Sequence, residues 1–268
     1  LIYLAIAGSS PVQWTIDRLV AMFESGVTET LANFREIFLA NTFGKTFKGA
    51  IRTHISHSLS HNCLPTQCGG LKNRGTDTGA MFLSSVIHYA SRTPNSLALF
   101  YLDLSSAFAS LRRFFIFRSH CPSDDHRIYI CRSMGIPSQH FRSIIDSLDS
   151  NHAIDFLKLP PSLQTLIESI TKTSAFVNEG LPTLNVYTRG SSAGTPLADV
   201  LFLLLMARIL SSIRADLHDK HLLHVFDFQP SDIISQSEID SIDHNSECSY
   251  IDDVAFWALY PTRQNRLF

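Results

Sequence analysis

The sequence predicts an α+β fold in which helices pack on an antiparallel sheet. Two segments predict the sheet. Residues 97–104, LALFYLDL, form a short apolar run bounded by turn residues, and residues 249–259, SYIDDVAFWAL, have the form strand, turn, strand. Helical spacing of apolar residues over much of the remaining chain predicts the helices. With 268 residues, of which 45% are hydrophobic, the chain can bury a sizeable core.

The N-terminal part of the chain is expected to be helical. Residues 11–34 show helix-like spacing around Leu19, Val20 and Phe23, and residues 41–59 form a second, interrupted helical pattern.

A Gly-rich turn, QCGGLKNRGTDT at residues 67–78, precedes a third predicted helix. Asp77 or Thr78 is expected to cap this helix, and Pro94 is expected to end it. The apolar run 97–104 that follows is typical of a central strand.

The second half of the chain begins with a helix-prone stretch, residues 119–172, which several prolines interrupt and which we interpret as an insertion or scaffold. Segments 174–178 and 184–188 alternate in polarity and predict a hairpin. A long helix is expected over about 196–217, and the acidic segment 227–247 is expected to be a solvated loop.

Charge is unevenly distributed along the chain. Residues 35–132 contain twelve Lys or Arg and five Asp or Glu, whereas residues 215–262 contain ten acidic residues and one Lys. This pattern fits a protein that binds phosphates with one part and cations with another, although two solvated faces of an ordinary domain would look the same.

Cysteine content and hydropathy exclude several classes of protein. The five cysteines include no CxxC pair, so neither a disulfide scaffold nor a zinc ribbon is indicated, and a reducing compartment is expected. The run 200–207, VLFLLLMA, is too short to span a bilayer. The opening LIYLAIAG lacks a basic flank and is interpreted as an interior segment rather than a signal peptide.

Adjacent carboxylates at Asp252 and Asp253 predict a metal site. Like charges in an apolar segment are costly unless a cation lies beside them. Asp103 also ends a predicted strand just before a helix, and pairing of the two strands would bring it to the same place. Three carboxylates could hold two Mg²⁺ ions, because magnesium prefers hard oxygen ligands and paired ions support in-line nucleotidyl transfer.

Histidine spacing offers a weaker alternative metal site. His54, His57 and His61 lie on one predicted helical face, and three further histidines repeat a spacing of three. That second set consists of His218, His221 and His224. Neither set has a carboxylate or cysteine at ligand spacing, so polar helix faces are the simpler interpretation.

Five segments in one order resemble the reverse transcriptase domain of non-LTR retrotransposons. YLDLSSAFASL (101–111) resembles the first palm motif, and YIDDVAFW (250–257) resembles the Tyr-x-Asp-Asp hairpin. RGSSAGTPLADVLF (189–202) is similar to the family's Gly-x-x-Gln-Gly-x-Pro-Leu segment. NFREIFLANTFGK (33–45) and QCGGLKNRGTD (67–77) are similar to the two fingers motifs that precede it.

The resemblance assigns a role to each of these segments. It implies that Asp103, Asp252 and Asp253 are the catalytic, metal-binding carboxylates. It implies nucleotide-binding roles for Arg35, Arg74, Phe108, Gly194 and Tyr250, with Phe108 excluding a ribose 2′-hydroxyl. It implies template contacts for Gly190, Thr195 and Pro196.

The resemblance also implies the architecture and the partners. Fingers would comprise about 1–94 and 119–188, and the palm about 95–118 and 189–268, in a single domain fragment. The chain ends fifteen residues after Asp253, so a thumb is expected to be absent. The implied cofactors are two Mg²⁺ ions, with Mn²⁺ as a substitute. The implied partners are an RNA template, a DNA primer and deoxynucleoside triphosphates, with no membrane and with intracellular, nuclear action.

Two further hypotheses stay open at this point. Ala193 stands where the family has glutamine and Glu24 where it has lysine, which would suit a catalytically inactive remnant that binds nucleic acid at most. An RNA-templated RNA polymerase would share the carboxylates, but Phe108 argues against it, since such an enzyme needs a small polar residue or Asp to select ribose.

Overall fold

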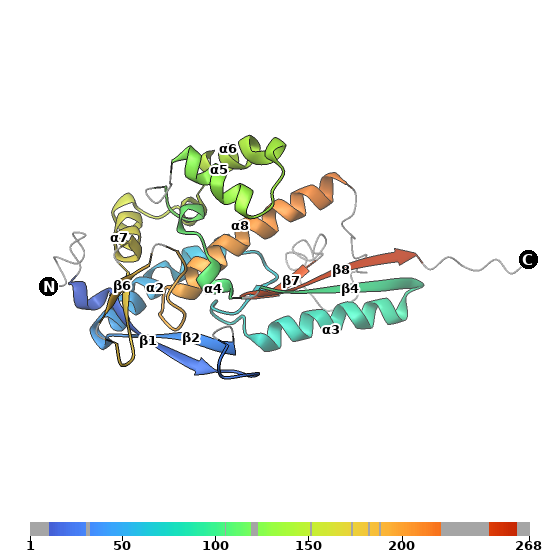
Figure 1. Cartoon of the computed structure of the whole chain (residues 1–268). Coiled ribbons are helices and arrows are strands. Elements are labelled where there is room, and N and C mark those ends of the chain that lie inside the picture. The colour runs from blue at the N-terminus through green and yellow to red at the C-terminus, as the bar shows by residue number, and fades with distance from the viewer. Residues whose placement is uncertain are drawn as a thin grey trace, which may run out of the picture. The chain divides into compact units, whose positions relative to one another are not determined.

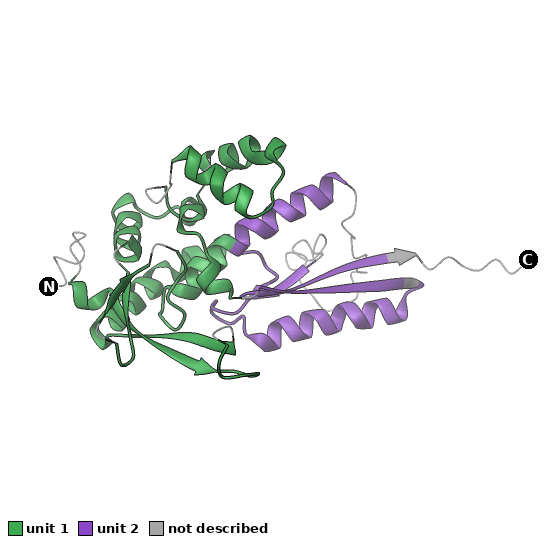
Figure 2. Cartoon of the chain, in the orientation of Figure 1, with its two compact units in different colours: residues 1–62, 106–205 green, residues 63–105, 206–268 purple. Residues whose placement is uncertain are grey.

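The computed structural model describes residues 11–30, 33–104, 106–118, 123–150, 152–172, 174–181, 183–187, 189–220 and 247–261. Two compact units divide the chain, residues 1–62 with 106–205 and residues 63–105 with 206–268 (Figure 2). These bounds differ from the expected fingers and palm segments: helix 76–92 belongs to the second unit, and residues 189–205 belong to the first. The predicted loop 227–247 lies outside the described residues, except for Glu247.

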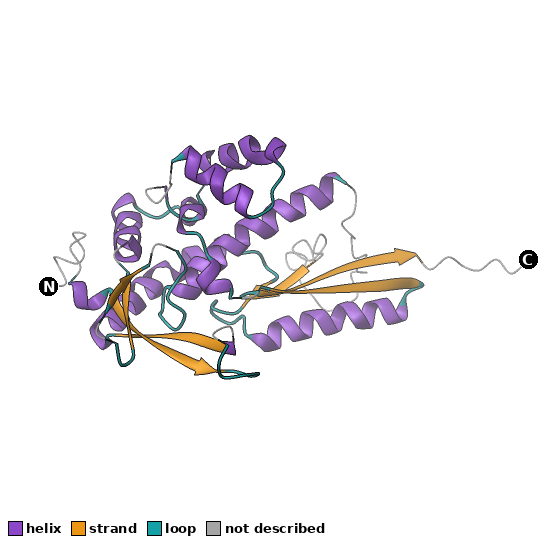
Figure 3. Cartoon of the chain, in the orientation of Figure 1, coloured by secondary structure: helices purple, strands orange, loops and turns teal. Residues whose placement is uncertain are grey.

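Unit 1 contains a mixed sheet with strand order β2-β1-β5-β6 (Figures 1 and 3). Its strands are β1 (Ile16–Phe23), β2 (Phe34–Ala40), β5 (Ala175–Asn178) and β6 (Leu184–Val186). Strand β1 pairs antiparallel with β2 and parallel with β5. The predicted hairpin of β5 and β6 is confirmed by their antiparallel pairing.

The prediction of a helix over residues 11–34 is wrong. A short 3₁₀ turn, η1 (Val12–Trp14), leads into β1, and residues Asp17 to Phe23 pair in register with β2. Leu19 and Val20 fit a helical spacing equally well over so short a window. Pairing with neighbours on both sides decides for the strand, because tertiary context overrides a weak local pattern.

The remaining elements of unit 1 are mostly helical. They are α2 (Thr42–Asn62), α4 (Ala107–Ser110), η3 (Arg113–Phe115), α5 (Asp124–Ser133), η5 (Ser138–His140), α6 (Phe141–Ser150), η6 (Ala153–Leu157), α7 (Pro161–Lys172) and the first turns of α8 (Ala198–Asp219). The helices predicted over 41–59 and 196–217, and the proline-interrupted helical stretch, are confirmed.

Helix α2 illustrates why these segments are helical. The Asn41 side chain accepts a hydrogen bond from the Phe43 amide at 3.0 Å and so caps the first turn. Ile51, Ile55 and Leu59 follow at intervals of four and are all buried. Helix α8 is buried around most of its circumference from Ala198 to Leu204, which explains its nearly continuous apolar sequence.

Unit 2 contains the second sheet, with strand order β3-β7-β8-β4. The sheet was expected to be antiparallel but is mixed, because β3 pairs parallel with β7. Its elements are β3 (Gln67–Cys68), α3 (Thr76–Arg92), β4 (Asn95–Asp103), β7 (Glu247–Tyr250), β8 (Asp253–Pro261) and the part of α8 from Met206 onward. The predicted hairpin of β7 and β8 is confirmed, as is the strand over 97–104.

The core of unit 2 lies between α3 and one face of this sheet. Val86 and Ala90 of α3 pack with Trp257 and Leu259 of β8, and with the partly buried Leu97 and Leu99 of β4. Figure 1 shows α3 running alongside β4. The sheet therefore holds its carboxyl-bearing end on a well-packed scaffold.

Two local expectations for unit 2 are wrong. Helix α3 begins at Thr76 with Gly75 as its N-cap, so Asp77 lies in the first turn and does not cap the helix. The negative charge of Asp77 still interacts favourably with the helix dipole at this end. Within the described sheet β4 pairs only with β8 and is an edge strand rather than a central one. Phe100, Tyr101 and Leu102 of this apolar run are exposed.

No helix among the described residues combines the length and apolarity that a membrane crossing requires.

Candidate metal and nucleotide sites

The sheet of unit 2 brings the sequence-predicted carboxylates together. Strands β4 and β8 pair antiparallel over their whole length, and this register places Asp103 directly opposite Asp253. Asp252 occupies the two-residue turn of the β7–β8 hairpin, where Tyr250 pairs with Asp253. The strand pairing on which the predicted convergence of Asp103 and Asp252 depended is therefore present, and their convergence on one metal site stays a prediction.

Opposed carboxylates create a site that favours cations. Directly opposite residues on antiparallel strands have Cβ atoms about 4.5–5.5 Å apart, and like charges there are destabilising. Asp103 and Asp253 are exposed and Asp252 is half-buried. Oxygen donors of this kind suit Mg²⁺. Among the described side chains, no three His, Cys, Asp or Glu groups converge into a metal cluster, so the fit rests on the opposed pair with Asp252 beside it.

The hairpin turn itself is strained. Ile251 has a φ of +53°, although a β-branched side chain rarely adopts left-handed backbone geometry. Such outliers persist only where the surrounding structure enforces them, and they cluster at functional sites. Here the turn places Asp252 and Asp253 at the end of the sheet.

The segment 67–77, identified independently in the sequence, lies against this hairpin. Strand β3 pairs parallel with β7, and the Ile251 amide donates to the Cys68 carbonyl at 3.1 Å. Gly69 has a φ of +79°, and a Cβ on it would lie 2.6 Å from Ile251 Cγ1 and 3.0 Å from Tyr250 Cε2. Gly69 is therefore required by the close approach of the strained turn, a role that the sequence alone did not indicate.

Replacing Gly69 with alanine is expected to destabilise the protein by about 1–3 kcal/mol, because the new methyl group meets the hairpin at a positive φ. Urea unfolding would measure the change. Gly180→Ala is the matched control, since Gly180 has a φ of +80° with nothing within 4 Å of its added Cβ. Equal losses in the two variants would show that backbone strain alone matters and that the contact with Ile251 does not.

A mainly apolar pocket of about 440 Å³ opens at the carboxylate end of this sheet. Asp103, Asp253 and Tyr250 line it together with residues from the first turns of α3, including Gly79 and Leu83.

Arg74 lies two residues before the start of α3 and donates from Nη1 to the Leu64 carbonyl at 2.8 Å, so part of its guanidinium supports the loop that follows α2. A nucleotide-binding role for Arg74 stays a prediction.

In unit 1, four of the predicted nucleotide and template residues converge on one pocket of about 360 Å³. Phe108, Gly194, Thr195 and Pro196 all line it. Phe108 also contacts the buried ring of Phe202, with ring centroids 5.3 Å apart. An aromatic ring that is fixed on one side and open to a pocket on the other suits contact with a sugar or base.

Two glycines shape the loop that forms this pocket. Gly190 has a φ of +79°, and its added Cβ would lie 3.1 Å from the carbonyls of Phe108 and Ala109. The Ser191 amide donates to the Phe108 carbonyl at 2.8 Å. Gly194 has a φ of +94° and lies against the Phe38 carbonyl of β2. The loop is thus held against both the Phe108 segment and the sheet of unit 1.

The same pocket has two cationic residues that sequence reasoning missed, Lys45 and Arg52 of α2. Arg52 forms an ion pair of 2.7 Å with Asp199 and donates a hydrogen bond of 3.2 Å to the Pro196 carbonyl. Burial raises the pKa of Asp199, and Arg52 opposes that rise. Lys45 is exposed and makes no ion pair with any described residue. The only sequence signal for these two cations is that they lie seven residues apart, which places them on one face of the same helix two turns apart.

Arg35 is placed differently from the other predicted nucleotide ligands. It lies on β2, exposed, and forms an ion pair of 2.7 Å with Glu24, and it does not line the Phe108 pocket. A triphosphate would have to compete with Glu24 for this guanidinium. The Arg35 side chain is 70% exposed and the Glu24 side chain is 50% exposed, so the ion pair contributes little to stability.

The histidine alternative gains no support from the described residues. His54, His57 and His61 are exposed on α2, and within the described part of the chain no metal cluster of three ligands includes them. His218 is exposed near the end of α8, whereas His221 and His224 lie outside the described residues.

Comparison of the sequence with models of protein families and with curated proteins gives no match in either case.

Proposed function

We propose that this chain is the catalytic core of an RNA-directed DNA polymerase that extends a primer with deoxynucleotides. The observation that carries the proposal is the strand register that sets Asp103 opposite Asp253, with Asp252 in the adjoining strained turn. These carboxylates would hold two Mg²⁺ ions, which when bound supply activation of the primer 3′-hydroxyl and stabilisation of the leaving pyrophosphate.

Other residues would position the substrates. The Phe108 ring would contact the incoming sugar and disfavour a 2′-hydroxyl, while Gly194, Thr195 and Pro196 would let the backbone approach the nucleotide and template. The loop bearing them is anchored by the hydrogen bond from Ser191 to the Phe108 carbonyl, so sugar and template contacts would move together. Arg35, Arg74 and Tyr250 would complete the nucleotide contacts.

Primer extension tests the proposal. The chain is incubated with poly(rA)–oligo(dT), Mg²⁺ and dTTP, beside its Asp252→Asn, Asp253→Asn double variant. If the parent chain extends the primer and the double variant does not, the result would support the proposed polymerase. Failure of both chains would favour the alternative below.

The alternative is an inactive retroelement remnant that binds nucleic acid at most. The Glu24–Arg35 ion pair favours it, because a triphosphate would have to displace Glu24 from this guanidinium, at a cost of up to about 1 kcal/mol. Glu24→Gln separates the two functions, since it should improve dTTP use by a working polymerase and leave a remnant inactive.

Lys45→Ala is expected to weaken binding of single-stranded RNA by about 3–10-fold near 0.1 M salt, and to reduce the salt slope of log K by about one, because Lys45 would contact one phosphate. Fluorescence anisotropy across a salt series measures both quantities. Lys172→Ala is the control, an exposed lysine of α7 in the same unit. An unchanged slope for Lys45→Ala would exclude the phosphate contact.

A further inference from the structure

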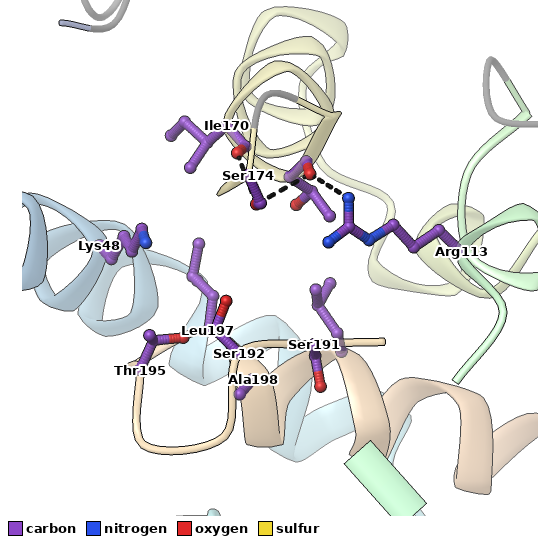
Figure 4. A pocket seen from close by; sticks show the side chains of 11 residues that line it. Lys48, Arg113, Ile170, Ser174, Ser191, Ser192, Thr195, Leu197 and Ala198 are labelled. Carbon is purple, nitrogen blue, oxygen red and sulfur yellow. Dashed lines mark hydrogen bonds between the residues drawn. The ribbon is translucent and has the colours of Figure 1, made fainter. Parts of the chain in front are cut away.

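Two buried cations face one cavity in unit 1. Lys48 of α2 is 5% exposed and Arg113 of η3 is 2% exposed. Figure 4 shows their side chains entering from opposite sides, with Ser174 between them and Ser192 and Thr195 on a third side. The cavity measures about 20 Å³. That is room for a single water-sized particle and not for a polyatomic anion such as sulfate.

The cations are incompletely compensated. Lys48 Nζ lies 3.7 Å from Asp17 Oδ1, longer than a hydrogen bond, and Asp17 Oδ1 accepts no hydrogen bond from the described residues. Arg113 donates from Nε to the Gly190 carbonyl at 2.9 Å and also donates to the Thr171 carbonyl. Its guanidinium lies over the Tyr187 ring, 4.7 Å from the centroid, and no described carboxylate lies within 4 Å of it.

The local charge therefore sums to one excess positive charge. Asp17 balances one of the two cations, and Tyr187 stays neutral because burial raises its pKa to about 12. An unbalanced buried charge is costly unless a counter-charge accompanies it. Burial lowers the pKa of Lys48, with Arg113 adding to that effect and Asp17 opposing it.

Hydroxyl groups in the cavity wall supply further donors. Ser191 is 6% exposed and its Oγ has no hydrogen-bond partner among the described residues. Thr195, 8% exposed, also lines the cavity. A buried hydroxyl left in this state calls for an ion or a water as its partner.

We infer that this cavity binds one halide-sized monovalent anion, for which chloride is the available ion, between Lys48 and Arg113. The anion would accept from the ammonium, the guanidinium and the wall hydroxyls. It would lie behind the 189–196 loop, whose other side forms the Phe108 pocket, because Ser191, Ser192 and Thr195 contribute to the cavity. The inference stands on these contacts and does not depend on the proposed polymerase activity.

Thermal unfolding of the full chain at constant ionic strength tests this inference. Chloride and bromide should raise Tm in a saturable way, by about 5 °C, relative to gluconate, whereas sulfate should not. Crystals grown in bromide should give an anomalous peak between Lys48 Nζ and the Arg113 guanidinium. A Tm that follows ionic strength irrespective of the anion, or bromide-containing crystals without that peak, would overturn the inference.

A matched pair of variants tests the role of charge. Ser174→Asp supplies an internal carboxylate where Figure 4 places Ser174, between the two cations, and should abolish the chloride dependence of Tm. Ser174→Asn adds a side chain of the same shape without charge and should keep that dependence. Chloride dependence retained by the folded Asp variant would count against the site, and the bromide measurement on the parent chain decides the matter if the Asp variant does not fold.

Discussion

Asp103→Asn is expected to lower the rate of primer extension by at least about 10²–10³-fold while leaving the chain folded. The substitution removes one of the two carboxylates that the β4–β8 register places opposite each other, and loss of a single electrostatic partner of the reacting groups commonly costs that much. Single-turnover extension with Mg²⁺ measures the rate.

Stability supplies a second measurement for the same variant. Without metal, Asp103→Asn should be as stable as the parent or more stable by up to about 1 kcal/mol, because opposed like charges are removed. Added Mg²⁺ should stabilise the parent more than the variant, since only the parent keeps the full ligand set. Asp219→Asn, an exposed carboxylate of α8, is the control. Parent-level extension by Asp103→Asn would contradict the assigned metal site.

Arg214→Met is expected to destabilise the protein by about 3–5 kcal/mol, because it leaves the Glu247 carboxylate buried without its cation. Glu247 is 1% exposed, and Arg214 Nε donates to its Oε1 at 2.6 Å. Arg214 also donates to Thr66 Oγ1 at 2.8 Å, which in turn donates to Glu247 at 3.2 Å. Because Glu247 is the first residue of β7, the destabilisation should extend to the β7–β8 hairpin, which carries Asp252 and Asp253.

Urea unfolding measures that loss against a matched exposed pair. Arg142→Met breaks the Arg142–Asp146 ion pair, in which both side chains are more than half exposed, and should cost no more than about 1 kcal/mol. The double variant Arg214→Met, Glu247→Leu should recover much of the stability, because it removes both charges. A loss for Arg214→Met no larger than that for Arg142→Met would show that Glu247 finds sufficient compensation elsewhere.

Local patterns were sufficient for much of the fold. Helix α2, with Ile51, Ile55 and Leu59 at intervals of four, and the β7–β8 hairpin around Asp252 were both predictable because their signals lie within a short window. The pattern failed for β1, where Leu19 and Val20 fit a helix as well as a strand. Only pairing with β2 and β5, remote in sequence, resolves that ambiguity.

The candidate site shows the same division. The sequence by itself determined the residue types that suit metal and nucleotide chemistry, notably Asp103, Asp252 and Asp253, because a carboxylate keeps its chemistry wherever it lies. Tertiary structure alone decided that Asp103 faces Asp253, that Gly69 supports the strained Ile251 and that Lys45 joins Phe108 at one pocket. Register and close approach depend on contacts between segments far apart in the chain, and no local pattern encodes them.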